Sequence, residues 1–266
     1  MSDLVDDQGT PAVHAPAAVR RVVSLVPSLT EAVAVTAPGL VVGATDWCTH
    51  PAGLDVPRVG GTKNPRVDAV VALGPDLVLA NEEENRAADV DALRAAGLHV
   101  WVTAPRTLAE SFGSLRRMLA ACGLDRPPWL DQAWQAWSNT YDASPPRLTA
   151  VVPIWRRPWM VLGSSTFAGD VLRQLGIANV YGTHAERYPK IGIDELVSCG
   201  ADLVVLPDEP YAFTAMDGPE AVGALPAALV SGRHLTWYGP SLLEARDVLE
   251  AQLAAATFQP QGSGQR

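Results

Sequence analysis

Short apolar runs alternate along the chain with segments of helical periodicity. Runs such as Val22–Val26, Leu40–Thr45 and His99–Thr103 are rich in β-branched and aliphatic residues, which predicts buried strands. The segments between them carry capping residues at their starts and glycine at their ends, as helices do. Strands that alternate with helices predict parallel sheets, whose ligands lie beyond the carboxyl ends of the strands.

One helix–strand pattern occurs twice. Val67–Ala80 aligns without a gap on Ile193–Leu206, which places Asp68 on Asp194 and Gly74 on Gly200. Each copy predicts a short helix that begins at an aspartate and ends at a glycine, followed by a buried parallel strand. The pattern is common in α/β proteins, but two copies on either side of one helical segment predict two α/β lobes.

That helical segment lies within Asp125–Ser144. Leu130, Trp134, Trp137 and Tyr141 recur at helical spacing and share one face. A helix from Pro128 to Ala143 would be about 24 Å long. The predicted fold class is therefore α/β, with two Rossmann-like lobes joined by a single long backbone helix. The predicted boundaries are 1–19 for a disordered tail, 20–105 for the N-terminal lobe, 106–146 for a helical linker, 147–258 for the C-terminal lobe and 259–266 for a second disordered tail.

The C-terminal lobe carries four further predicted features. Trp159–Gly163 is expected to be a strand and Trp155 a core residue. His234–Trp237 is expected to be a last short strand, and Ser241–Thr257 a terminal helix.

Composition and charge narrow the classes of partner. The formal net charge is −9 over 266 residues and no Lys/Arg cluster stands out, which argues against nucleic acid and anionic membranes as partners. No apolar run is long enough to predict membrane insertion. The start of the chain carries Asp3, Asp6 and Asp7 where an export signal needs basic residues, so a cytoplasmic location is expected. A periplasmic or cell-surface location would follow if the start codon were assigned wrongly.

Six motifs, in this order, resemble a known family. They are VVSLVPSLTEAV, VVGATDWCTHP, PRVGGTKNP, VDAVVALGPDLVLANEEEN, RYPKIGIDELV and WYGPSLLEA, which together run from about Arg21 to Thr257. The chain is similar to the class III substrate-binding proteins of ABC importers, the helical-backbone group that binds cobalamin, haem or iron–siderophore chelates. The resemblance implies two lobes with a metal chelate held in the cleft between them. It implies no required cofactor.

The resemblance also implies positions for ligand contacts. In cobalamin-binding members aromatic residues of both lobes line the cleft, and Trp47, Trp159, Trp237 and Tyr238 fall at or near such positions. At the end of DLVLA, where those members place an aromatic residue, this chain has Asn81 and then an acidic run. The full set of expected ligand-binding residues is Trp47, His50, Asn81, Glu82, Glu83, Trp159, Arg187, Tyr188, Trp237 and Tyr238.

Several of these residues also have a purely structural interpretation. The tryptophans would serve equally as core, and the acidic run Glu82–Glu84 would be stabilised by the dipole of a following helix. His50 is a candidate axial ligand for cobalt or iron, or a loop histidine bonded to backbone. Arg187 could meet an anionic ligand group or remain solvated.

Docking on an ABC permease is implied by the same resemblance. Members of the family dock through one acidic residue per lobe at the start of a short helix. Asp68 and Asp194 fall there, with Glu195 beside the second, although an aspartate at a helix start is also explained by capping alone.

Two other function classes remain open at this point. One is a cytosolic enzyme that processes tetrapyrroles or corrinoids, for which His50, Glu83 and His184 are candidate catalytic groups. The other is an interaction module with a vestigial cleft. The first expectation is a monomeric, non-catalytic receptor for a metal chelate, with corrinoids ahead of haem and siderophores.

Overall fold

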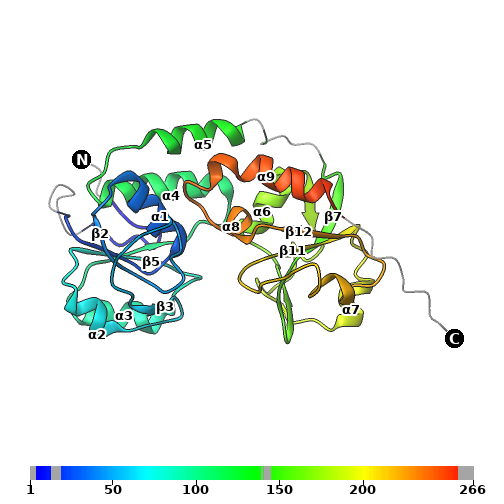
Figure 1. The fold of residues 1–266 in the computed structure, drawn as a ribbon, viewed down its shortest axis with the longest axis horizontal. Helices are drawn as coiled ribbons and strands as arrows, with labels where there is room; N and C mark the ends of the chain where they lie inside the picture. The colour runs from blue at the N-terminus through cyan, green and yellow to red at the C-terminus, as the bar shows by residue number, and fades with distance from the viewer. Residues whose placement is uncertain (1–3, 13–18, 139, 141–144, 257–266) are drawn as a thin grey trace. The chain divides into compact units, whose positions relative to one another are not determined.

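The computed structural model describes residues 4–12, 19–138, 140 and 145–256. Within them the chain forms two compact units (Figure 1). The first comprises residues up to Pro105, Ala109–Trp134 and Tyr238–Pro240; the second comprises Arg106–Leu108, Gln135–Trp237 and the residues from Ser241 onward. Each contains its own parallel sheet, which confirms the predicted α/β class with two lobes.

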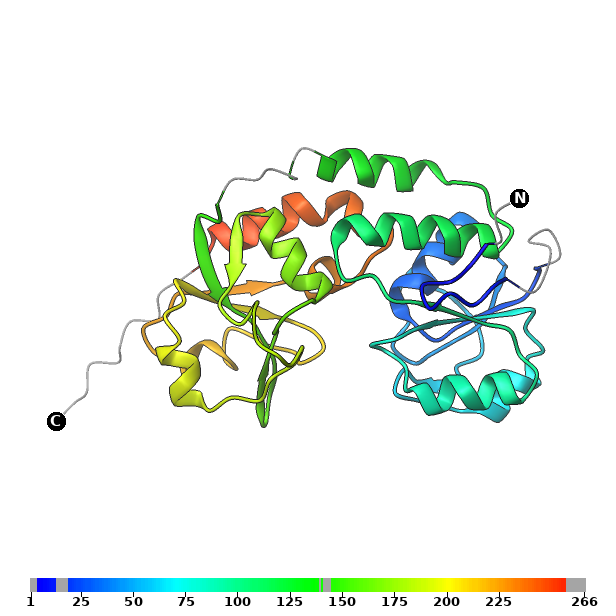
Figure 2. The same cartoon turned by 180° about the vertical axis from the view of Figure 1, so that it is seen from behind.

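The N-terminal unit is built on a four-stranded parallel sheet in the order β2-β1-β5-β6. Valine and leucine side chains fill the space between this sheet and α2 and α3, and α1 and α4 lie on the opposite face (Figures 1 and 2). A small antiparallel hairpin, β3–β4, precedes α2. The elements of the N-terminal unit are β1 (Val22–Ser24), α1 (Pro27–Thr36), β2 (Val41–Ala44), β3 (Gly60–Gly61), β4 (Asn64–Pro65), α2 (Val67–Ala72), β5 (Leu77–Asn81), α3 (Ala87–Ala95), β6 (Val100–Thr103) and α4 (Leu108–Ala121). The first residue of α4 belongs to the second unit.

The C-terminal unit has a four-stranded parallel sheet in the order β10-β7-β11-β12. Numbered within each unit, both sheets therefore follow the order second, first, third, fourth. An antiparallel hairpin, β8–β9, leaves the end of the first strand. The elements of the C-terminal unit are β7 (Leu148–Val151), β8 (Pro153–Arg156), β9 (Trp159–Val161), α6 (Phe167–Gln174), β10 (Ile177–Asn179), α7 (Ile193–Ser198), β11 (Leu203–Pro207), a 3₁₀ turn (Pro219–Ala221), β12 (Ala227–Val230), α8 (Gly232–Thr236) and α9 (Leu242–Ala254).

The sequence repeat forms the second helix–strand step of each unit, and its strand is the third strand of that unit's parallel sheet. Its two copies are α2–β5 and α7–β11, and both strands are buried along their whole length. A repeated aspartate ties each third strand to its neighbour: Asp76 accepts the backbone N–H groups of Arg20 and Arg21, and Asp202 accepts that of Thr149. The hydrogen bonds from Thr149 lower the pKa of the Asp202 carboxyl.

The chain between the two sheets forms two helices. These are α4 and α5 (Pro128–Ser138), so the helix predicted to reach Ala143 is described only to Ser138; Tyr141 and the rest of its expected end lie outside the described residues. Within α5, Leu130 and Trp137 are buried as predicted, but Trp134 is 41% exposed. The buried face passes instead through Trp129 and Ala133. The unit boundaries differ from the expected linker accordingly, because most of α4 and the first half of α5 belong to the N-terminal unit.

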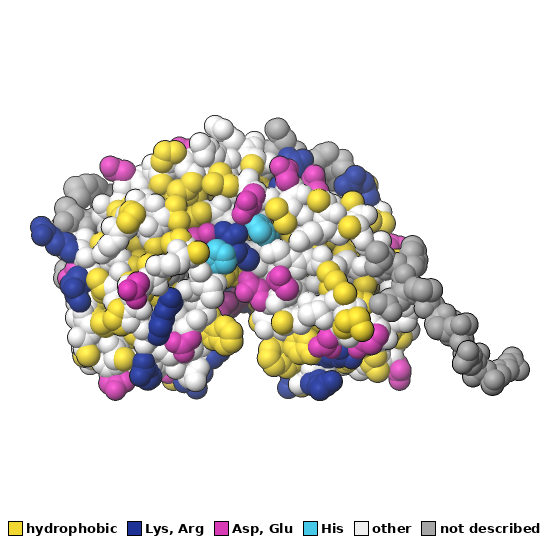
Figure 3. Space-filling model, viewed as in Figure 1, with side chains coloured by type: hydrophobic (Ala, Val, Ile, Leu, Met, Phe, Trp, Pro, Cys, Tyr) yellow, Lys and Arg dark blue, Asp and Glu magenta, His cyan; other side chains and the backbone are white. Residues whose placement is uncertain are grey.

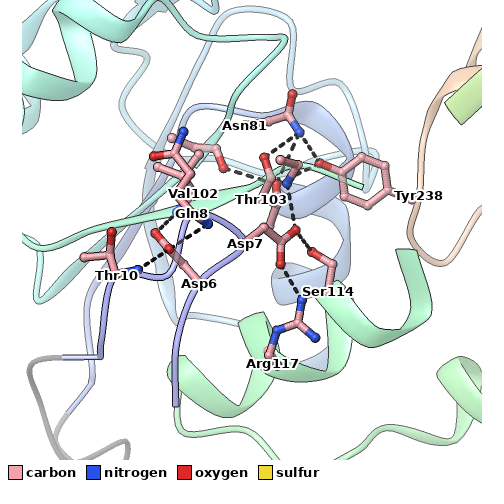
Figure 4. A network of polar contacts seen from close by, with 12 residues as sticks. Asp6, Asp7, Gln8, Thr10, Asn81, Val102, Thr103, Ser114, Arg117 and Tyr238 are labelled. Atoms are coloured by element: carbon pink, nitrogen blue, oxygen red, sulfur yellow. Dashed lines mark hydrogen bonds and ion pairs between the residues drawn. The ribbon is translucent and has the colours of Figure 1, made fainter. Parts of the chain in front are cut away.

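The start of the chain does not follow the expected disordered tail over residues 4–12. Asp7 donates its backbone N–H to Val102 O at 3.1 Å and Asp6 Oδ2 accepts the N–H of Val102, which extends the edge of the sheet at β6 (Figure 4). The Asp7 carboxylate also accepts hydrogen bonds from Ser114 Oγ at 2.6 Å and Arg117 Nη2 at 2.5 Å. The expected tail at 259–266 lies outside the described residues.

Near the other end of the chain, His234–Trp237 is not the expected strand. Residues 232–236 form the short helix α8, closed by a hydrogen bond from the Thr236 hydroxyl to Gly232 O at 2.9 Å. The last strand of the sheet is instead β12, the Ala-Leu-Val run that follows Pro226.

Candidate functional site

The loop that follows β2 presents the exposed indole of Trp47, which is 66% exposed. Its neighbour Cys48 points inward, where its sulfur contacts the hydroxyls of Thr30 and Thr45 at 3.0 and 3.1 Å. The Arg58 guanidinium donates hydrogen bonds to the carbonyls of Thr45, Cys48 and Leu54. The loop is therefore held from inside while Trp47 faces solvent. Sequence reasoning missed Arg58, because its partners are backbone atoms that no motif marks.

His50 and Cys48 point to different surroundings, and His50 as an axial ligand of a bound chelate stays a prediction. The His50 ring contacts the Thr49 hydroxyl at 3.1 Å, and the Cys48 thiol is buried, which raises its pKa and disfavours the thiolate that a metal would need. Among the described residues, no three His, Cys, Asp or Glu side chains lie close enough together to hold a metal ion.

The acidic loop after β5 is organised by Asn81. Its side-chain oxygen accepts the N–H groups of Glu83 and Glu84 at 2.8 and 3.1 Å. Its side-chain nitrogen donates to Tyr238 Oη at 2.7 Å and to Thr103 O (Figure 4). Asn81 is 5% exposed, and its donors and acceptor are used inside the unit. Asn81 therefore positions the loop that carries Glu82 and Glu83, and its own contact with a ligand stays a prediction.

A second asparagine joins this loop to the β3–β4 hairpin. Asn85 Nδ2 donates to Thr62 O at 2.9 Å, and Asn85 Oδ1 accepts the N–H of Asn81 at 2.9 Å. Lys63 on the hairpin reaches the carbonyl of Glu83. Glu82 is exposed and Glu83 is half-buried, so both remain on the surface of the loop.

Trp237 and Tyr238, expected to line a ligand site, are buried at 8% and 6% exposure. The Tyr238 hydroxyl lies 2.8 Å from Thr103 Oγ1, and burial raises its pKa. Arg233 lies 5.8 Å from the centre of the Trp237 ring. Both rings are packed in the structure, and Tyr238 anchors the short Tyr238–Pro240 segment to the N-terminal unit; their contact with a ligand stays a prediction.

In the C-terminal unit, aromatic rings gather beyond the carboxyl ends of β7 and β11. Trp159 on the β8–β9 hairpin stacks on Phe213 with an interplanar angle of 7°, and Trp155 meets Tyr211 edge to face. Arg156 lies over Trp159, and its guanidinium is ion-paired with both Asp217 and Glu220. Trp155 is 42% exposed, so its expected place in the core is wrong.

Arg187 and Tyr188 lie on the loop before α7. The Arg187 guanidinium donates twice to Ser165 O, at 3.1 and 2.8 Å, and lies against the Tyr188 ring. Ser165 has a positive φ of 53°, a conformation that costs a non-glycine residue energy, and the two hydrogen bonds help to hold it. Both Arg187 and Tyr188 stay half-exposed.

The expected docking residues are all exposed. Asp68 and Asp194 lie in the first turns of α2 and α7, where neither caps the helix with its side chain. Glu195 accepts a hydrogen bond from Tyr181 Oη at 3.0 Å. Beside Asp194 is a shallow apolar hollow of about 540 Å³ that includes Val197, Val222 and Leu225. Charged side chains of both signs are interspersed on the face shown in Figure 3.

The sequence and the fold are both similar to those of known binding proteins. The chain is 21% identical over 189 residues to a vitamin B12-binding protein of Vibrio parahaemolyticus, which covers 68% of each chain. Among solved structures, the periplasmic vitamin B12 binding protein BtuF of Vibrio cholerae superposes with a TM-score of 0.72 at 18% identity, covering 89% of this chain and 97% of that one. Helicobacter pylori CeuE with bound Ni(II) gives a TM-score of 0.76 at 15% identity, with 95% and 88% covered.

A haem-binding protein also has a similar fold. The periplasmic haem-binding protein RhuT of Roseiflexus sp. RS-1 has a TM-score of 0.70 at 18% identity, with 88% of this chain and 99% of that chain covered. No helix in the described part of the chain is both long and apolar enough to cross a membrane. The family model described as periplasmic binding protein matches residues 22–221, which confirms the resemblance found in the sequence: the chain belongs to the periplasmic binding protein family.

Proposed function

We propose that this protein is a non-catalytic receptor for a metal chelate, with a corrinoid as its first candidate ligand. The observation that carries the proposal is the placement of flat aromatic surfaces on strand-end loops of each unit. Trp47 follows β2 in the N-terminal unit, and the Trp159–Phe213 stack follows β7 and β11 in the C-terminal unit. Aromatic faces bind flat macrocycles with a large apolar contact and a small loss of side-chain entropy.

The relatives support this class of ligand. Two similar proteins are named as vitamin B12-binding and one as haem-binding, and all are named for binding alone. The chelate contacts that we assign are Trp47, Glu82 and Glu83 in the N-terminal unit and Trp159, Arg187 and Tyr188 in the C-terminal unit. The carboxylates suit the amide side chains of a corrin ring, which donate hydrogen bonds.

Working with an ABC permease is part of the proposal. Asp68 and Asp194 occupy matching first turns of the two repeat helices and keep their carboxylates exposed, as docking requires. The Asp68→Ala/Asp194→Ala double variant should bind the chelate as the unchanged protein does and lose its stimulation of a reconstituted corrinoid importer. Since the solved B12- and haem-binding relatives are described as periplasmic, the cytoplasmic location expected from the sequence has no support from them.

The test is a fluorescence titration of the purified protein with hydroxocobalamin, haem and a ferric siderophore in parallel. The proposal predicts saturable one-to-one tryptophan quenching, strongest in affinity for the corrinoid. Saturable binding of haem or the siderophore alone would support a chelate receptor and contradict the corrinoid as its ligand. No saturable response to any of the three chelates would refute the proposal.

A further inference from the structure

A second candidate site lies within the N-terminal unit, away from the strand-end loops. Helices α4 and α5 run side by side in both views, and a hollow of about 360 Å³ opens along their seam (Figures 1 and 2). This α4–α5 groove is lined by Ala109, Phe112, Gly113, Arg116, Arg126, Leu130 and Trp134, all of which belong to one unit.

The groove is lined by two aromatic rings and by two small residues of α4. Phe112 and Trp134 meet edge to face with centroids 5.2 Å apart, and Trp134 keeps 41% of its surface exposed. Ala109 and Gly113 lie one helical turn apart on the wall formed by α4. A Cβ atom on Gly113 would meet only Arg117 Nη1, at 3.5 Å, so the missing side chain leaves free space.

Two guanidinium groups add positive charge to this apolar groove. In the part of the chain that the structure describes, the Arg116 side chain makes no hydrogen bond or ion pair. Among the residues that the structure describes, Arg126 is ion-paired with Asp131, and both side chains are about half exposed, so a ligand can compete with that pair at small cost. A planar guanidinium next to aromatic rings suits an anion attached to a flat apolar body.

We propose that the α4–α5 groove binds an aromatic organic anion. A flat ring lies against Trp134 and Phe112, and its carboxylate or sulfonate faces Arg116, with Arg126 as a second partner. The volume of the groove falls at the lower end of the roughly 300–1,000 Å³ range of small-molecule sites. This site is independent of the proposed chelate site, because the two share no residue.

The test uses two probes with the same aromatic body. 8-Anilinonaphthalene-1-sulfonate carries a sulfonate, and N-phenyl-1-naphthylamine lacks it; binding is followed by their fluorescence. The sulfonate should bind one to one and more tightly than the neutral probe. Arg116→Gln should weaken the sulfonate by about fivefold, the upper range for an exposed ion pair, and leave the neutral probe unchanged. Ala109→Leu should fill the groove and weaken both probes.

Matched controls separate this groove from other probe sites. Arg20→Gln removes an exposed charge in the same unit, and Ala95→Leu enlarges an exposed helical alanine on α3; neither should change the affinity of either probe. Circular dichroism confirms that each variant is folded. Equal sulfonate binding in all four variants would overturn the proposal and leave the groove as a surface for a partner helix, and weaker binding only in the controls would overturn it as well.

Discussion

Replacing Trp47 by alanine should weaken chelate binding and leave the fold nearly intact. The indole is 66% exposed, so roughly two-thirds of a tryptophan's 200 Å², about 130 Å², is available to a ligand. At about 25 cal/mol per Å² this area corresponds to about 3 kcal/mol. A flat ligand covers one face of the ring, which halves the figure to about 1.5 kcal/mol, or about tenfold in affinity.

The effect on stability should be small for the same reason. Only about a third of the Trp47 surface is buried in the structure, so Trp47→Ala should lower the free energy of unfolding by less than about 2 kcal/mol. Isothermal titration calorimetry with the best chelate measures the affinity, and urea unfolding measures the stability.

Trp134→Ala is the matched control. It removes another exposed tryptophan, which lies in the α4–α5 groove and on none of the strand-end loops. Its chelate affinity should equal that of the unchanged protein. The reasoning is refuted if Trp47→Ala binds the chelate normally, or if both variants lose the same affinity.

Three other predictions concern the fold. Trp137 is fully buried and donates to Leu242 O at 2.9 Å, so Trp137→Ala should cost about 3–5 kcal/mol in urea unfolding; a cost below 1 kcal/mol would contradict its place in the core. Tyr238→Phe removes one hydrogen-bond partner from Asn81 and one from Thr103, each of which keeps a second, and should cost about 0.5–1.5 kcal/mol in the same assay; an unchanged midpoint would argue against this anchor. Burial raises the pKa of the Cys48 thiol and raises that of Cys122 to about 12, so only the partly exposed Cys199 should react with Ellman's reagent at pH 8 in the native state; a second fast thiol would contradict this.

The repeat shows how much of the fold local sequence could predict. The helix–strand steps of 67–80 and 193–206 appear where the pattern places them, because helix starts, glycine stops and apolar runs are local signals. The prediction of a strand at His234–Trp237 was wrong because a four-residue run with Leu235 and Trp237 at alternate positions suits a strand and a helical turn equally well. The segment forms a helical turn closed by local hydrogen bonds, from the N–H of Trp237 to Arg233 O and from the Thr236 hydroxyl to Gly232 O.

Interactions across long sequence distances account for the other differences. Asp6 bonds to Val102 and Asn81 to Tyr238, partners that are 96 and 157 residues apart. Neither pair has a local pattern, so a polar N-terminal segment reads as a tail and a loop asparagine reads as a ligand contact. The exposed Trp47 was predictable, because it follows a strand in a glycine- and proline-rich loop.

Equilibrium dialysis of the purified protein against hydroxocobalamin tests the central claim most directly, with haem and a ferric siderophore dialysed in parallel. The account predicts one chelate bound per chain at saturation and recovery of that chelate with its mass and absorption spectrum unchanged. The absence of saturable binding to all three, or recovery of a chemically altered chelate, would contradict a non-catalytic chelate receptor.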